Sequence, residues 1–240
     1  MHAAYKLSCP LCFALVAALA ANPALVHAQA PASSAKVLLN DAVGPAGPKV
    51  SISEVTLAPG SEFQSHAAGG PAFIYVLEGN IEGQEGSNTV RTYQAGEGLR
   101  HLRTQDHRAL RNASPSVSAK LLEFQFADAT GLEVSHLVQL PLDNAPGRNA
   151  RLNALKLDPA WVGNGAHSHG GPVFIFVVKG AVESQVEPGE PEVYRAGEYF
   201  HELPGQIHRL FRNFSKTEPA ELLTFQVSDE KGAFTATAVK

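Results

Sequence analysis

The stretch HSHGGPVFIFVVKG, residues 167–180, decides the fold class of this chain. It begins with two histidines two positions apart and continues, between glycines, as an unbroken run of β-branched and aromatic side chains. Short runs of this kind, bounded by Gly, Pro, Asn and Ser, are typical of β-strands. After residue 28, no stretch of the chain keeps a helical periodicity for more than a turn or two. We therefore predict an all-β protein.

The same stretch occurs twice in the chain. GGPAFIYVLEG (69–79) returns as GGPVFIFVVKG (170–180), and HRALRNAS (107–114) returns as HRLFRNFS (208–215), each time 101 positions later. A repeat of roughly one hundred residues matches the size of a domain and indicates two tandem domains rather than a solenoid. The predicted limits are 1–28 for a signal peptide, 29–130 for the first domain and 131–240 for the second.

The first 28 residues differ in character from the rest. Lys6 precedes an apolar stretch that ends near Ala21, and small residues around Ala28 offer a cleavage position. This pattern predicts a secretory signal peptide, because the apolar stretch falls short of the about 20 residues that span a membrane. Both cysteines, Cys9 and Cys12, lie inside it, so the mature chain has no thiol for a disulfide or a metal site. We predict export, to a bacterial periplasm.

The charge balance excludes two classes of partner. The formal net charge is −4, and no run of basic residues occurs in the sequence. Nucleic acid and an anionic membrane surface are therefore not expected as partners. A small-molecule substrate is expected instead. A homodimer formed by sheet packing is also an option, because exposed edge strands need cover.

The second copy resembles the cupin superfamily. The first motif of that family is matched by Gly165, the pair His167 and His169, and Gly180, and the second motif by Gly197, Gly205, His208 and Asn213. Cupins are jelly-roll barrels, so the resemblance implies two tandem jelly-roll barrels, a bicupin. Quercetin dioxygenases are bicupins of this kind. The resemblance covers residues 37–229 and is more specific in the second copy.

Two departures from the family pattern affect the expected site. Where the family places a metal-binding Glu, this chain has Val173 in the second copy and Ala72 in the first. The Pro of the second motif is also displaced by one residue, to Pro204. The three-His, one-Glu ligand set of the family therefore does not transfer whole.

The second copy nevertheless offers a metal site. Residues i and i+2 of a strand point to one face, so His167 and His169 can both face the barrel interior. His208 follows a Gly-containing turn, and three imidazoles suit Zn, Cu, Fe or Ni. Glu202 is nominated as the fourth ligand, because the position 101 residues earlier is His101, another ligand type. The predicted cofactor is a divalent transition metal, with Fe, Mn, Ni, Cu and Zn left open.

The first copy keeps a partial set of the same residues. His66, His101 and His107 could form a second metal site, or they could be remnants of the duplication with hydrogen-bonding roles. Gln84 and Gln185 recur at the same offset and are candidates for substrate binding, although an outward-facing polar pair explains them equally well. Asn112 and Asn213 are expected to serve the fold through side-chain bonds to the backbone.

Two functional hypotheses follow. A histidine-rich site with an open coordination position can support oxygenase, isomerase or hydrolytic chemistry, and the resemblance favours a dioxygenase that acts on a small phenolic or enol-type compound. The alternative is a non-catalytic module that binds a small ligand or a metal, which the missing Glu at Val173 favours. The sequence does not identify catalytic residues, the metal, the substrate or the reaction.

Overall fold

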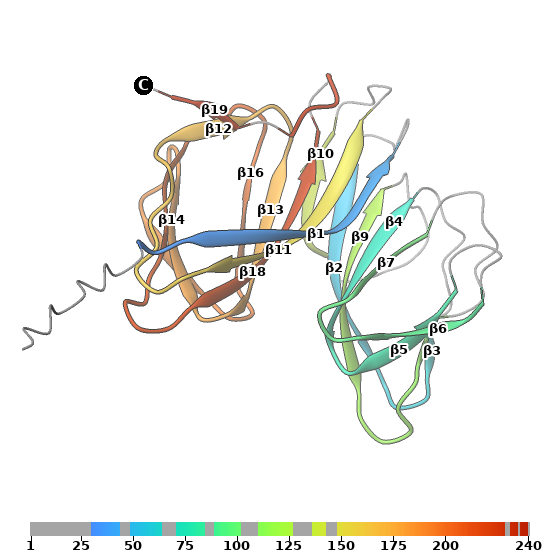
Figure 1. Ribbon diagram of the computed structural model, residues 1–240. Helices are drawn as coiled ribbons and strands as arrows, with labels where there is room; N and C mark the ends of the chain where they lie inside the picture. The colour runs from blue at the N-terminus through green and yellow to red at the C-terminus, as the bar shows by residue number, and fades with distance from the viewer. Residues whose placement is uncertain are drawn as a thin grey trace, which may run out of the picture. The chain divides into compact units, whose positions relative to one another are not determined.

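The computed structural model of the 240-residue chain describes most of the residues from position 30 onward. The described residues are 30–43, 49–63, 71–84, 89–101, 110–126, 136–142, 148–228, 231–234 and 236–239. Within these ranges the elements are β-strands and there is no helix, which confirms the all-β prediction (Figure 1). None of the described residues forms a helix that could cross a bilayer.

The second copy builds two five-stranded antiparallel sheets. In spatial order, one sheet contains β1 (Ser33–Ala42), β11 (Asn149–Leu157), β18 (Ala220–Val227), β13 (Val173–Lys179) and β16 (Tyr199–Glu202). The other sheet contains β15 (Glu192–Arg195), β14 (Ala181–Val186), β17 (His208–Asn213), β12 (His167–His169) and β19 (Ala236–Ala238). Val173 and Ile175 of β13 and Phe200 of β16 belong to the core of the barrel that these two sheets form, which we call the second barrel.

The first copy repeats this plan. One sheet contains β10 (His136–Pro141), β2 (Lys49–Leu57), β9 (Ala119–Phe126), β4 (Ala72–Glu78) and β7 (Gly98–His101). The other sheet contains β3 (Glu62–Phe63), β8 (Leu110–Asn112), β5 (Asn80–Gly83) and β6 (Arg91–Gln94). Ile74, Val76 and Leu99 belong to the core of this first barrel.

The two copies exchange their first strands. β1 precedes the first repeat but pairs with β11 of the second copy, from Ser33↔Leu157 to Ala42↔Asn149 (Figure 1). β10 precedes the second repeat but pairs with β2 of the first copy. The predicted domain limits stay a prediction, because residues 127–135, around the expected join, lie outside the described part of the chain.

A third core explains why the run in β13 is apolar at every position. Val173, Ile175 and Val177 face the interior of the second barrel, whereas Phe174 and Phe176 belong to a separate cluster shared with the first copy. In that cluster the rings of Phe124 and Phe225 stack at a centroid distance of 4.4 Å. Side chains alternate between the two faces of a strand, so a strand buried on both faces is apolar throughout.

Asn112 and Asn213 stabilise equivalent turns, as predicted from their recurrence. Asn213 Nδ2 donates to the carbonyl oxygens of Leu157, Asp158 and Glu218, and its Oδ1 accepts the Ser215 N–H. Asn112 makes the same four kinds of bond in the first copy. Both amides are buried, so each satisfies backbone groups that would otherwise lose their partners.

Candidate metal centre

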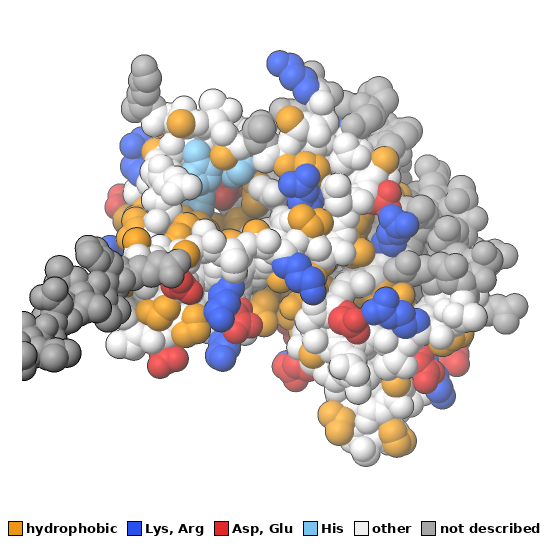
Figure 2. Space-filling model, viewed as in Figure 1, with side chains coloured by type: hydrophobic (Ala, Val, Ile, Leu, Met, Phe, Trp, Pro, Cys, Tyr) orange, Lys and Arg blue, Asp and Glu red, His pale blue; other side chains and the backbone are white. Residues whose placement is uncertain are grey.

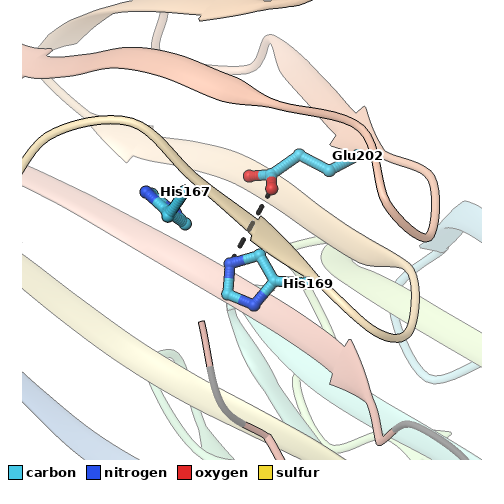
Figure 3. A group of neighbouring side chains, drawn as sticks. All are labelled: His167, His169 and Glu202. Carbon is cyan, nitrogen blue, oxygen red and sulfur yellow. Dashed lines mark ion pairs between the residues drawn. The ribbon is translucent and has the colours of Figure 1, made fainter. Parts of the chain in front are cut away.

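The candidate metal centre of the second barrel is formed by His167, His169 and Glu202. One ligand atom from each of the three side chains lies within 4.8 Å of the other two. Figure 3 shows the imidazole of His169 directed toward the Glu202 carboxylate, with His167 beside them. Strands β12 and β16, which carry these residues, belong to different sheets, so the barrel brings them together.

The short strand β12 presents both histidines to the same face. His167 pairs with His208 of β17, which aligns the two motif histidines across the sheet. The turn that follows β16 is tied to β12, because Gly205 N–H donates to the His169 carbonyl oxygen at 2.8 Å. Gly205 has a φ of +78°, a left-handed conformation that favours glycine.

Glu202 occupies the place of the acid that the first motif lacks. It pairs directly with Val173, the position at which the family pattern would place its Glu. Directly paired residues have Cβ atoms about 4.5–5.5 Å apart on one face of the sheet. The carboxylate therefore reaches the site from the neighbouring strand. In the first copy His101 pairs with Ala72 in the same register.

The Glu202 carboxylate is buried and only partly satisfied. Its Oε1 accepts a hydrogen bond from His208 Nδ1 at 2.8 Å, and its Oε2 lies 3.8 Å from His169 Nε2. Among the described residues Oε2 has no hydrogen-bond partner, and water has little access to it because only 3% of the side chain is exposed. A buried carboxylate oxygen without a donor is costly, and a divalent cation between it and the imidazoles would satisfy it. The donor set therefore fits a divalent transition metal.

The surroundings of the two β12 histidines suit metal ligands. His167 Nδ1 lies 3.1 Å from the Gly165 carbonyl oxygen, so in the neutral ring Nδ1 carries the proton and Nε2 keeps its lone pair. Burial lowers the pKa of His169 below its ordinary value of 6.5 and outweighs the nearby Glu202 carboxylate, which raises it. A metal ligand must be the neutral imidazole, so this shift keeps the site competent at a lower pH.

His208 is close to the group, but its ring nitrogens have other partners. Nδ1 donates to Glu202, and Nε2 lies 2.8 Å from the Ser184 hydroxyl oxygen. In the neutral imidazole Nε2 is then an acceptor, so the Ser184 hydroxyl donates to it. In this arrangement His208 orients the Glu202 carboxylate, and its predicted role as a metal ligand stays a prediction.

Ser184 is a residue of the site that the sequence did not indicate. It is 2% exposed and alternates on β14 with Gln185. The equivalent residue of the first copy is Gly83, so the duplication gives no signal for it. Only the pairing of β14 with β17 brings its hydroxyl to His208.

Replacing Ser184 with Ala is expected to weaken metal binding about tenfold, because partners that orient metal ligands typically contribute 10–100-fold in affinity. Without the hydroxyl, His208 loses the hydrogen bond that fixes its tautomer. The hydrogen bond from His208 Nδ1 to the Glu202 carboxylate is then weakened. Titration of the metal-free protein with Co(II) measures this. Ser168→Ala, on the opposite face of β12, is the control. Equal affinities in the two variants would contradict a role for Ser184.

The other predicted site residues lie elsewhere. Gln185 is on the face of β14 opposite to Ser184 and donates to the Gly189 carbonyl oxygen, so this geometry does not support its substrate role. Gln84 follows β5 directly. His66 and His107 lie outside the described residues, and the side chain of His101 is also outside the description. The second metal site and the substrate role of Gln84 stay predictions.

A pocket with a volume of 420 Å³ opens beside His167. Its lining is mostly apolar and comes from the segment before β12, from β17 and from β19: Trp161, Phe211 and Ala238 are representative, and Arg209 supplies the one charge in the lining. The ring of Trp161 meets that of Phe211 edge-on at 5.6 Å. Figure 2 shows histidine side chains at the surface beside a hollow over this barrel. The pocket therefore adjoins the candidate centre at His167.

Comparison with known proteins finds related folds. The family model described as Cupin domain matches residues 154–225. AerE from Microcystis aeruginosa aligns with a TM-score of 0.57 and 13% identity, over 80% of this chain and 99% of that one. No curated protein matches the sequence.

Two enzymes are among the similar structures. Bacillus subtilis oxalate decarboxylase, described with Mn(II) centres, aligns with a TM-score of 0.57 and 12% identity, over 89% of this chain and 81% of that one. Salicylate 1,2-dioxygenase from Pseudaminobacter salicylatoxidans aligns with a TM-score of 0.54 and 13% identity, over 76% and 71%. At these identities the likeness concerns the fold, and it confirms the predicted jelly-roll architecture.

Proposed function

We propose that this chain, in which residues 154–225 match the cupin domain model, is a metal-dependent enzyme of the oxygenase type that acts on a small organic substrate. The observation that carries the proposal is the approach of His167, His169 and Glu202 to within 4.8 Å of one another. Two histidines and one carboxylate, with coordination positions left open, are the donor set of non-haem Fe(II) oxygenases.

Each residue of the centre has a distinct task in this proposal. His167 and His169 supply neutral nitrogen donors, and Glu202 supplies the negative charge that lowers the net charge of the bound cation. A bound divalent metal would supply a Lewis-acid centre at which a small molecule is polarised. Ser184 and His208 hold the carboxylate in place. The mostly apolar pocket beside His167 offers a place for an organic substrate.

The alternative, a module that binds without turnover, loses its main support. The absence of an anionic ligand at Val173 favours a binding module. Glu202, however, places a carboxylate directly opposite Val173 on the neighbouring strand. Support for catalysis also comes from the similar fold of salicylate 1,2-dioxygenase, although the identity of 13% limits this support to the fold.

Oxygen uptake tests the proposal. The mature protein is stripped of metal, loaded with Fe(II), Mn(II) or Co(II), and mixed with a panel of phenolic and β-diketone compounds. Metal-dependent oxygen consumption is expected with at least one compound and should be absent in His169→Ala. One equivalent of bound metal with no consumption across the panel would favour the binding module instead.

Export to a bacterial periplasm belongs to the same proposal. Its support is the pattern of the first 28 residues and the lack of cysteine after residue 12. Mass spectrometry of the protein from the periplasmic fraction is expected to show an N-terminus near residue 29. A full-length chain retained in the cytoplasm would contradict it.

A further inference from the structure

The metal-binding strand β12 has little support from the rest of its sheet. Among the described residues it pairs with β17 at one position, His167↔His208. Its other neighbour is β19, the last strand of the chain, which pairs with all three residues of β12: His167↔Ala238, Ser168↔Thr237 and His169↔Ala236. A further bond runs from Val239 N–H to the Ala166 carbonyl oxygen at 3.0 Å. The C-terminal strand is therefore the main partner of the strand that carries both histidines.

We infer that β19 is a positioning element of the metal centre, which holds His167 and His169 in register for the cation and forms one wall of the adjoining pocket. This inference rests on the proposed metal-dependent function. Residues paired directly across two strands point to the same face, so Ala236 and Ala238 lie beside the two imidazoles. Both alanines also line the pocket next to His167. Their small side chains leave space for the imidazole rings of His167 and His169.

The position of β19 in the repeat supports this role. The residue 101 positions before Thr237 is His136, which pairs with Ser53 of β2 and so serves the strand exchange. The equivalent position of the first copy thus has a different pairing, whereas β19 pairs with the strand that carries the HxH pair. All three residues of β19 are exposed, so the strand contributes little to the cores.

The geometry suggests how to release β12 without damaging the barrel. Hydrogen-bonded and non-hydrogen-bonded pairs alternate along an antiparallel ladder. The bond from Val239 to Ala166 makes the pair Thr237↔Ser168 the next hydrogen-bonded one. Proline at 237 removes the N–H of that pair and its ring clashes with the neighbouring strand. Thr237→Val keeps the N–H and a β-branched side chain, so it is the matched control.

The test uses the full mature protein and two readouts. In metal-free Thr237→Pro, the amides of residues 167–169 should exchange at least about tenfold faster than in Thr237→Val, because local opening governs exchange. The dissociation constant for Co(II) should rise by about tenfold or more, with a changed visible spectrum of the bound ion. The temperature of global unfolding should differ by no more than about 3 °C between the two variants, because Thr237→Pro releases only an exposed edge strand.

Equal amide exchange in the two variants would overturn the inference, and so would equal Co(II) affinity and spectra. Val239→Pro, which removes the bond to Ala166, should reproduce the effect if Thr237→Pro does not fold. Failure of the proposed function looks different: the unmodified protein would bind no Co(II), while the exchange measurement on the metal-free variants would still decide whether β19 holds β12.

Discussion

Glu202→Gln should weaken binding of Co(II) or Mn(II) by at least about a hundredfold, because even partners that only orient ligands contribute 10–100-fold. The variant removes the negative charge that faces His169 and replaces one carboxylate oxygen by an amide N–H₂, which cannot coordinate a cation. It keeps the size of the side chain, so the pairing with Val173 and the barrel should be unchanged. Isothermal titration of the metal-free protein measures the effect.

The matched control is Glu190→Gln, which makes the same chemical change at an exposed position of the turn after β14. It should bind metal like the unmodified protein. His167→Ala should lose metal to a similar extent as Glu202→Gln, since both remove a donor of the same group. If Glu202→Gln binds metal as well as Glu190→Gln does, Glu202 is not a ligand and the site needs another donor.

Phe225→Ala should destabilise the protein by about 3–5 kcal/mol, the usual cost of truncating a buried Phe. Phe225 is fully buried between the sheets of the two copies, where its ring stacks on Phe124 and meets Phe73 edge-on. Removal of the ring leaves a cavity in the closely packed core shared by the two copies, and the surrounding backbone cannot close around it. The free energy of unfolding in urea measures the loss.

Phe214→Ala provides the comparison, because Phe214 is 51% exposed, only eleven positions away in the sequence. A surface substitution of this kind should change stability by no more than about 0.5 kcal/mol. Comparable losses in the two variants would mean that the shared core does not hold the two copies together.

The architecture follows from local patterns. The all-β class is visible in short apolar runs between glycines, because side-chain alternation and turn residues are properties of neighbouring positions. The HxH pair is visible for the same reason, since residues i and i+2 of a strand share a face. Comparison of the two copies predicts Glu202 as a ligand, because ligand residue types occur at equivalent positions.

Other features of the site have no local signal. Ser184 looks like any strand serine, and its bond to His208 exists only because β14 lies beside β17. Gln185 recurs in both copies and so attracted a functional prediction, but the alternation of β14 turns it away from Ser184. The exchange of β1 and β10 between the copies is also invisible in the repeat.

The sequence by itself determined the strand composition, the duplication and the histidine pair, because these depend on periodicity and spacing along one segment. Only the tertiary structure decided from which direction the Glu202 carboxylate approaches the pair, which side chains hold it and which strand supports β12. The pairing of Val173 with Glu202 and of His167 with Ala238 joins segments far apart in the chain. Such contacts are set by sheet register, and register is fixed by packing of the whole barrel rather than by any one stretch of residues.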